Sequence, residues 1–230
     1  MRDMCYGIYM PARNSTKAYV ENGYYHIYNR GVEKRIIFLD QQDYAVFLSY
    51  LKDYLLPKNE KELYERLSNP SVSSKEKDKA LKLLHLNNFS QEITLLSYCL
   101  MPNHFHFFIK QKSANAIDKF MNSLATRYTM YFNRKYKRVG TLCQDVYKAV
   151  LINSEAQFLH LSRYIHKQAL ALKNQPCSYP EYLGLRQTLW IKPDEIISFF
   201  SKTNPSLSYR NFVEQPEDAE GLEDLILEDN

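Results

Sequence analysis

Two apolar segments separated by only three residues constrain the fold of this chain more than any other feature. Residues 92–100 are mostly apolar, as expected for a buried strand, and residues 104–109 read His-Phe-His-Phe-Phe-Ile. The residues between them, Met-Pro-Asn, have the composition of a turn, because proline and asparagine favour reversals of the chain. We therefore expect two strands joined as a hairpin near the middle of the chain.

Helical and strand-like segments alternate on either side of this hairpin. Apolar residues at helical spacing predict the helices, and short aromatic or β-branched runs predict the strands. The order strand, helix, strand, strand, helix, strand, helix indicates an α+β fold, and a ferredoxin-like antiparallel sheet with helices on one face fits it best. The remaining strands are predicted at 24–29 and 147–152, and the helices at 40–55, 114–136 and 155–172.

One main domain is expected from a length of 230 residues and an apolar content of 45%, because domains usually run to roughly 100–200 residues. Its predicted bounds are residues 23–184, after a polar lead-in over residues 1–22. Residues 185–230 form a C-terminal extension that ends in an acidic tail. Residues 58–90 are rich in Lys, Glu, Ser and Asn and predict a helical-hairpin insertion, interpreted as a solvated excursion without chemistry of its own.

The sequence shows no sign of a membrane or secretory destination. It has no apolar run of the roughly 18 residues that a membrane-spanning helix needs, and its N-terminus lacks a signal-peptide core. We therefore expect a soluble, cytoplasmic protein without a membrane partner. The four cysteines are far apart and form no CxxC pair, which argues against a zinc ribbon or a disulfide framework.

Charge is divided unevenly along the chain. The segment after Arg210 holds eight acidic residues and no Lys or Arg, which leaves 30 basic and 18 acidic residues in positions 1–210. A body with an excess of 12 positive charges attracts a polyanion such as nucleic acid. A solvated Lys-rich surface without a ligand is the common alternative. The 19 tyrosines favour nucleic acid slightly, since aromatic rings among basic residues can stack on unpaired bases.

The histidines of the second hairpin strand are the first candidates for chemistry. Side chains alternate between the two faces of a strand, so His104 and His106 emerge on one side while Phe105 and Phe107 point into the core. Two imidazoles at this spacing can chelate one metal ion, although such a pair is more often structural and a site needs a third ligand. That ligand would come from another element of the fold.

The helix predicted over residues 155–172 offers such a ligand. Tyr164 and Gln168 are four residues apart and therefore project from the same helical face. Two imidazoles and the amide oxygen of Gln168 would suit a labile Mg²⁺ or Mn²⁺ ion, which would also activate a neighbouring phenol as a nucleophile. His160 shares this face, and its interpretation stays open between a ligand, a base, a phosphate contact and an exposed helix histidine.

Three separated motifs together resemble those of the REP-associated tyrosine transposases and their insertion-sequence relatives, the HUH single-tyrosine transposases. The similarity extends from about Tyr24 to Gly184 and includes residues 140–144 and 179–184. The motifs occur in the expected order: Tyr25-His26-Ile27-Tyr28-Asn29-Arg30-Gly31, then Tyr98-Cys99-Leu100-Met101-Pro102-Asn103-His104-Phe105-His106, and then Arg163-Tyr164-Ile165-His166.

The resemblance implies a DNA transposase with a ferredoxin-like fold. It assigns His104 and His106 as metal ligands and Tyr164 as the nucleophile that cleaves and rejoins single-stranded, hairpin-bearing DNA through a 5′-phosphotyrosine bond. Gln168 stands where insertion-sequence members have a glutamine ligand and many REP-associated members have asparagine. Such proteins act in the cytoplasm on the nucleoid, as homodimers with sites completed in trans or as monomers.

The sequence departs from the family pattern after the tyrosine motif, where Lys167-Gln168-Ala169 replaces the usual continuation with its Asn-Pro stop, and in the length of the 58–90 insertion. Two other functions stay open: a domesticated nucleic-acid-binding protein without catalysis, and a metal-dependent phosphoesterase that uses water. Phosphate contacts are expected from basic residues. They are Arg30, Lys34, Arg35, Arg127, Arg134, Lys135, Lys137, Arg138 and Lys148.

Overall fold

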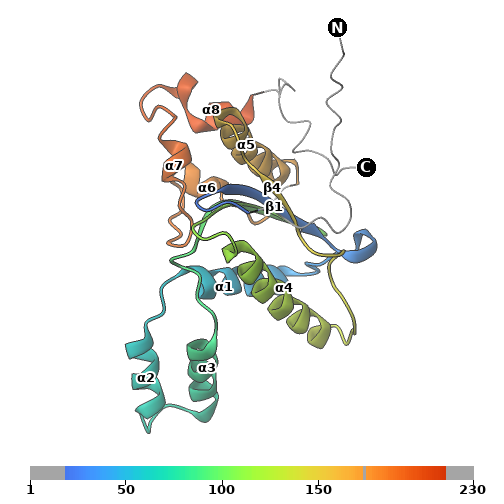
Figure 1. Cartoon of the computed structure of the whole chain (residues 1–230), viewed down its shortest axis with the longest axis vertical. Helices are drawn as coiled ribbons and strands as arrows, with labels where there is room; N and C mark the ends of the chain where they lie inside the picture. The colour runs from blue at the N-terminus through green and yellow to red at the C-terminus, as the bar shows by residue number, and fades with distance from the viewer. Residues whose placement is uncertain (1–18, 173–174, 216–230) are drawn as a thin grey trace.

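The computed structural model describes residues 19–172 and 175–215 (Figure 1). Most of the polar lead-in and nearly all of the acidic tail therefore lie outside the described residues. Within them, no helix is both long and apolar enough to span a membrane. Cys99, Cys143 and Cys177 are free thiols, the first and last of them buried.

Four antiparallel strands form one sheet in the order β2-β3-β1-β4. The central hairpin of β2 and β3 is present with its turn at residues 102–103, as predicted. With α1 between β1 and β2 and α4 between β3 and β4, the chain follows the β-α-β-β-α-β order of a ferredoxin-like fold. The predicted α+β class is confirmed. The strands are β1 Tyr24–Arg30, β2 Ile93–Met101, β3 His104–Gln111 and β4 Lys148–Leu151.

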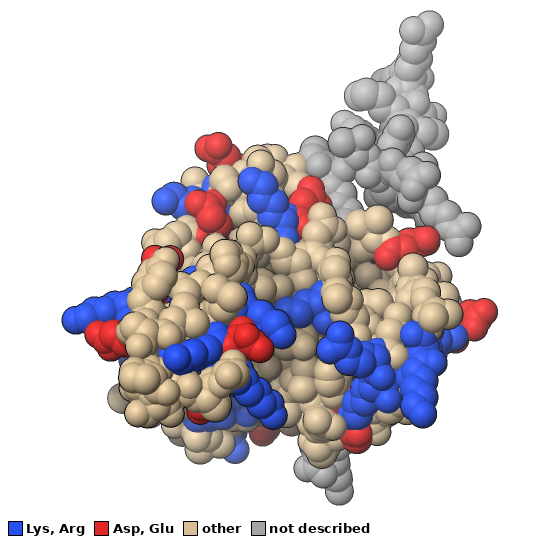
Figure 2. All heavy atoms as spheres, turned by 90° about the horizontal axis from the view of Figure 1, so that it is seen from below, with Lys and Arg blue, Asp and Glu red and all other residues tan. Residues whose placement is uncertain are grey.

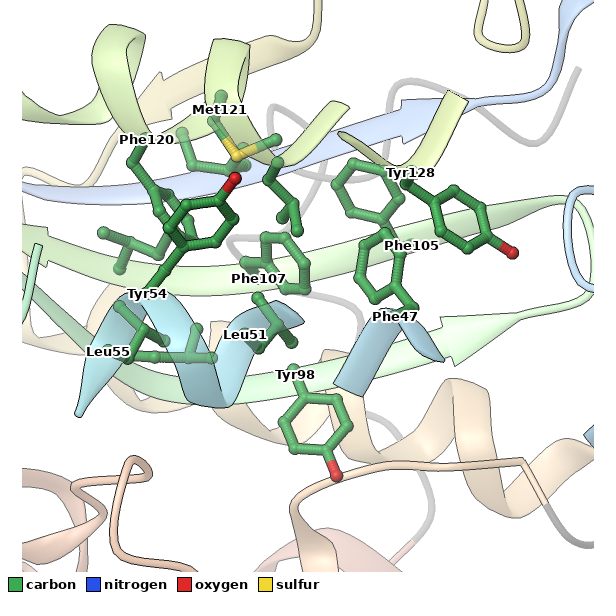
Figure 3. Packing of buried hydrophobic residues seen from close by; sticks show 14 of the residues in the cluster. Phe47, Leu51, Tyr54, Leu55, Tyr98, Phe105, Phe107, Phe120, Met121 and Tyr128 are labelled. Carbon is green, nitrogen blue, oxygen red and sulfur yellow. The ribbon is translucent and has the colours of Figure 1, made fainter. Parts of the chain in front are cut away.

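Helices α1 (Gln41–Leu55) and α4 (Ala116–Lys135) cover one face of the sheet. The aromatic rings of β3 that point to this face, Phe105 and Phe107, pack against Phe47 of α1 (Figure 3). Because these side chains are almost fully buried, this layer forms the larger of two apolar cores. It supplies the rigid support for the opposite face.

Helix α1 begins where the sequence predicts, through a capping box at its N-terminus. The Asp40 side chain accepts a hydrogen bond from the Asp43 amide, and the Asp43 side chain accepts one from the Asp40 amide. Asp43 has no exposed surface, and Lys135 at the end of α4 donates to it at 2.7 Å. Burial alone would raise the pKa of this carboxyl, but the hydrogen bonds from Lys135 and Tyr136 hold it below its usual value. The cap therefore also ties α1 to α4.

The opposite face of the sheet is covered by α5 (Glu155–Ala171) and by the C-terminal helices. Leu161 and Ile165 of α5 join Leu96 and Phe108 of the sheet in a second apolar core. The prediction of helices on one face is therefore wrong: helices cover both. The consecutive Phe107 and Phe108 show why, since neighbouring residues of a strand point to opposite faces and both rings need burial.

The C-terminal elements pack on α5 and also contact β2, where Cys177 pairs with Cys99 and the Tyr182 hydroxyl donates to the Leu96 carbonyl (Figure 1). Tyr209 and Val213 of the last helix are buried in the second core. These elements are α6 Tyr179–Tyr182, α7 Asp194–Ile197, the 3-10 helix η2 Pro205–Leu207, and α8 Tyr209–Glu214.

The insertion forms a helical hairpin that extends away from the sheet, as Figure 1 shows. Its helices are α2 (Glu60–Ser68) and α3 (Ser74–His85), and the second begins with a capping box between Ser73 and Glu76. Helix α2 buries no residue and α3 buries only Ala80. The predicted helical hairpin is therefore present, with the two helices packed mainly on each other.

Candidate functional site

The register between β1 and β3 gathers polar side chains on the face of the sheet that α5 covers. Tyr28 is opposite His106 and Arg30 is opposite His104, and residues directly opposite each other in an antiparallel pair share a face. His26, two residues before Tyr28, lies on the same face. The apolar second core lies at Phe108, next along the strand. Polar residues therefore occupy the end of this face nearest the β2–β3 turn.

The β1 strand ends at a close approach of the backbone. A Cβ atom on Gly31 would lie 2.2 Å from the carbonyl oxygen of Arg35, so only glycine fits there without a shift of the chain. The short 3-10 helix η1 (Val32–Lys34) follows at once. This close approach explains why the motif has glycine after Arg30. Arg30, the last residue of β1, lies at the rim of the polar face.

His104 and His106 project from one side of β3 as their spacing predicts. Their ring centroids are 4.9 Å apart and the rings are nearly perpendicular, at 88°. His106 is buried and His104 is half-buried. Phe105 and Phe107 point to the first core, which anchors the strand from behind. The predicted alternation along β3, with imidazoles on one face and core phenylalanines on the other, is therefore confirmed.

Helix α5 brings Tyr164 to the two histidines. Its ring lies 5.4 Å from that of His106, edge to face, and 5.9 Å from that of His26. The neighbours Leu161 and Ile165 are fully buried in the second core and hold the helix against the sheet. Imidazoles of a strand and a phenol of a distant helix therefore meet at one place.

Each of the paired imidazoles has a hydrogen-bond partner at Nδ1. His104 Nδ1 lies 2.6 Å from Asn103 Oδ1, and His106 Nδ1 lies 2.9 Å from His26 Nε2. Because an amide oxygen only accepts hydrogen bonds, His104 donates from Nδ1 and its Nε2 carries the lone pair. Metal-ligating imidazoles usually donate their second N–H to such an outer partner. The chemistry of His104 therefore fits a metal ligand through Nε2.

A third ligand is the remaining question for a metal site. Within residues 19–172 and 175–215, no three His, Cys, Asp or Glu side chains are grouped so as to hold a metal ion. Gln168 is half-buried on α5, one helical turn after Tyr164, as predicted. The structure thus brings two imidazoles together, and the amide oxygen of Gln168 stays the third ligand that the sequence predicts. Such a set suits a weakly held Mg²⁺ or Mn²⁺ better than a closed zinc site.

Burial keeps the inner imidazoles neutral. It lowers the pKa of His26 to about 3 and places that of His106 well below its usual value, where His26, His104 and Arg30 add repulsion. A neutral imidazole is the form that can ligate a metal or accept a hydrogen bond. Both functions are therefore available to these rings near pH 7.

A second phenol, that of Tyr28, belongs to the same group. Its ring lies 4.7 Å from His26 and 5.9 Å from His106. Burial raises the pKa of Tyr28 to about 12, and the nearby Tyr164 adds to this shift. Sequence reasoning assigned no role to His26 or Tyr28. The signal was present in the two-residue period of polar side chains at His26, Tyr28 and Arg30 within an otherwise buried strand.

The residues predicted to contact DNA separate into two groups. Arg30 and Lys148, which are opposite His104 and Tyr28 in the sheet, lie on the histidine face. Burial and the charge of Arg30 lower the pKa of Lys148. The second group lies elsewhere. Its members follow β1, or lie on α4, which covers the opposite face of the sheet, and on the turn after α4. They are Lys34, Arg35, Arg127, Arg134, Lys135, Lys137 and Arg138.

Several members of the second group are committed to contacts within the protein. Arg127 pairs with Asp53 at 2.8 Å and stacks on the ring of Tyr50 at 3.7 Å. Lys135 is bound by the acidic residues of the α1 cap. Figure 2 shows basic side chains gathered in groups on the face seen from below, with acidic ones among them. The nine phosphate contacts stay a prediction, and Arg127 and Lys135 are the members of the set whose charge is already paired within the protein.

Two other histidines of α5 face the C-terminal extension. His160 is half-buried and its ring packs against Phe212 at 5.6 Å, so it is not the exposed helix histidine considered above. His166 is fully buried, and its ring nitrogens contact Tyr209 Oη at 2.7 Å and Ser178 Oγ at 2.8 Å. His166 of the tyrosine motif therefore anchors the C-terminal segment.

The fold and the site together define an α+β domain in which imidazoles on the two central strands meet a phenol of the helix that covers them. Residues 68–168 match the model of the IS200-like transposase family, a stretch that holds His104, His106, Tyr164 and Gln168. The resemblance indicated by the motifs is confirmed over these residues.

Other comparisons extend beyond this stretch. A solved structure of a REP-associated tyrosine transposase bound to a REP hairpin is similar to this chain with a TM-score of 0.47 and 8% sequence identity. The similarity covers 78% of this chain and 96% of that chain. A comparison with curated proteins found no match.

Proposed function

We propose that this chain is a DNA transposase that cleaves and rejoins single-stranded, hairpin-bearing DNA through a covalent bond to Tyr164. The observation that carries the proposal is the position of the Tyr164 ring, 5.4 Å from the His106 ring, within the stretch that matches the IS200-like transposases. The excess of basic residues in the body of the chain supports a polyanionic substrate.

In the cleavage step, the phenol oxygen of Tyr164 forms a bond to phosphorus while the bond from phosphorus to the 3′ oxygen breaks. The phenol proton passes to water and the leaving oxygen takes a proton from water, which yields a 5′-phosphotyrosine and a 3′ hydroxyl. In the rejoining step a 3′ hydroxyl displaces the phenol oxygen. The number of phosphoester bonds is unchanged, so no external energy source is needed.

The remaining residues of the site prepare this attack. His104, His106 and the amide oxygen of Gln168 would hold a Mg²⁺ or Mn²⁺ ion, which when bound supplies positive charge to the phosphodiester and favours the phenolate. Arg30 and Lys148 place further positive charge on the same face and would contact phosphate oxygens. Leu161 and Ile165 hold Tyr164 in position through their burial.

The test is incubation of the protein with a labelled hairpin oligonucleotide and Mn²⁺, followed by denaturing gel electrophoresis. We expect the wild type and Tyr28→Phe to form a covalent protein–DNA adduct and Tyr164→Phe to form none. Tyr28→Phe is the matched control, because it removes the other phenol of the same site. Cleavage without an adduct in Tyr164→Phe would instead indicate a phosphoesterase that uses water. Binding without cleavage by the wild type would indicate a catalytically silent nucleic-acid-binding protein.

Proteins of this kind can act as monomers or as homodimers with sites completed in trans. Here we propose that one chain supplies both the imidazoles and the phenol, because β3 and α5 of the same chain bring them together. Mixing Tyr164→Phe with His106→Ala tests this arrangement. Recovery of adduct formation in the mixture would show that two chains share a site.

A further inference from the structure

His26 and His106 form a hydrogen bond between two buried imidazoles. His26 Nε2 lies 2.9 Å from His106 Nδ1, and the rings are nearly parallel, with 20° between their planes. His26 is 1% exposed and His106 is 6% exposed. Since burial disfavours charge on either ring, one shared proton occupies the line between these two nitrogens.

The position of that proton decides whether His106 can serve as a ligand. If it is on His106 Nδ1, the neutral His106 ring carries its lone pair on Nε2 and can bind a metal ion through that atom. If it is on His26 Nε2, the proton of His106 is on its own Nε2, and that atom is blocked. The two tautomers therefore correspond to a site that is ready for a ligand and one that is not.

The surroundings of His26 show that its imidazole is not required for packing alone. Its second nitrogen, Nδ1, is buried and has no hydrogen-bond partner among the described residues. A buried polar atom without a partner destabilises the fold, and an apolar residue at this position would avoid that cost. The neighbouring strand positions Tyr25 and Ile27 are filled by apolar side chains of the first core.

We propose that His26 is a positioning residue that accepts a hydrogen bond from His106 Nδ1–H and so holds His106 in the tautomer whose Nε2 can ligate a divalent cation. Its function parallels that of Asn103, whose Oδ1 accepts a hydrogen bond from His104 Nδ1. The inference rests on the proposed function in one respect, namely that His106 is a metal ligand. Outer partners of this kind orient the ring and raise its basicity.

The first test is the tautomer of His106 in the metal-free protein, measured by ¹⁵N–¹H correlation spectra of the imidazoles at neutral pH. We expect the wild type to carry the proton on Nδ1. The variant His26→Phe keeps a planar ring but removes the acceptor, so we expect His106 to shift toward the Nε2–H form. A wild-type His106 with its proton on Nε2 would overturn the inference without reference to any variant.

The second test is the affinity for Mn²⁺ alone, followed by electron paramagnetic resonance. We expect His26→Phe to weaken binding by about 10-fold to 100-fold, and His26→Gln, whose amide oxygen can accept the same hydrogen bond, to recover part of the loss. His166→Phe is the control, because it removes an equally buried imidazole that contacts Ser178 and Tyr209 outside the site. Its affinity for Mn²⁺ should match the wild type in the folded fraction measured by circular dichroism.

The outcomes separate this inference from the proposed function. Wild-type binding that is lost in His106→Ala but unchanged in His26→Phe and His26→Gln would overturn the positioning role and leave the metal site intact. Wild-type binding that His104→Ala and His106→Ala do not alter would overturn the metal site itself. If His26→Phe does not fold, the comparison of His26→Gln with the wild type and the wild-type tautomer decide the question.

Discussion

The two faces of the sheet differ in what their side chains do. The face under α1 and α4 is filled by aromatic and aliphatic residues such as Phe47, Phe105 and Phe107. The face under α5 is apolar at Phe108 but carries imidazoles and phenols where β3 begins. The face under α1 and α4 therefore provides most of the apolar burial. The face under α5 holds the reactive groups. Stability and chemistry are therefore largely divided between the two faces of one sheet.

The largest expected effect comes from a substitution on the α5 face, which carries the reactive groups. Tyr164→Phe should lower adduct formation by roughly 10³-fold or more, because the nucleophile is removed. The free energy of unfolding should change by less than about 1 kcal/mol, since the substitution keeps the half-buried ring and removes only its hydroxyl. Gel assays and urea unfolding of the same sample measure both. A large loss of stability would mean that the two faces are not separable in this way.

Phe107→Ala changes the opposite face of the sheet, in the core under α1 and α4. Removal of a fully buried ring should destabilise the protein by roughly 3–5 kcal/mol through lost burial and a residual cavity. Adduct formation per folded molecule should stay close to that of the wild type, because Phe107 points away from the histidines. Urea unfolding and a gel assay corrected for the folded fraction provide the measurement. A loss of activity in the folded fraction would indicate that the core also tunes the geometry of the site.

Acid should lower the free energy of unfolding through the buried histidines on the α5 side of the sheet. Burial lowers the pKa of His26 and of His166 to about 3, and lowers that of His106 as well. Unfolded histidines bind protons below about pH 6.5, so between that pH and the folded pKa the unfolded state binds more protons. The free energy of unfolding is therefore retained above about pH 6.5 and falls below it, by up to about 1.4 kcal/mol per pH unit for each histidine.

Replacement of one of these rings sharpens this prediction. His166→Gln leaves the other two histidines in place. The slope of the free energy of unfolding against pH should therefore fall by the contribution of one histidine, up to about 1.4 kcal/mol per pH unit. Urea unfolding at a series of pH values from 7 to 4 measures the slope. An unchanged slope would show that His166 does not titrate on unfolding.

The smallest expected effect concerns DNA binding by the basic residues of the two faces. Arg30→Gln should reduce the salt dependence of single-stranded DNA affinity by about one phosphate contact, because Arg30 lies on the histidine face. Arg127→Gln should leave it unchanged, since Arg127 is already paired with Asp53 and stacked on Tyr50. Fluorescence anisotropy over a range of salt concentrations measures both slopes. Equal effects of the two substitutions would show that DNA also contacts the α4 side.

Short-range patterns in the sequence determined much of this protein. The turn at Pro102 and Asn103 predicts the hairpin, and the two-residue period of β3 predicts that His104 and His106 share a side. The capping residue Asp40 marks the start of α1 correctly. These features follow from the sequence because neighbouring residues alone decide them, through backbone preferences and the alternation of side chains.

Only the tertiary structure decided what lies beside those histidines. The pairing of β1 with β3 places His26 and Tyr28 next to His106, and the packing of α5 brings Tyr164 to the same point. The tertiary structure also places helices on both faces of the sheet. It places some basic residues on the histidine face and others on and around α4. Register and helix packing depend on burial between segments far apart in the chain, which no local periodicity encodes.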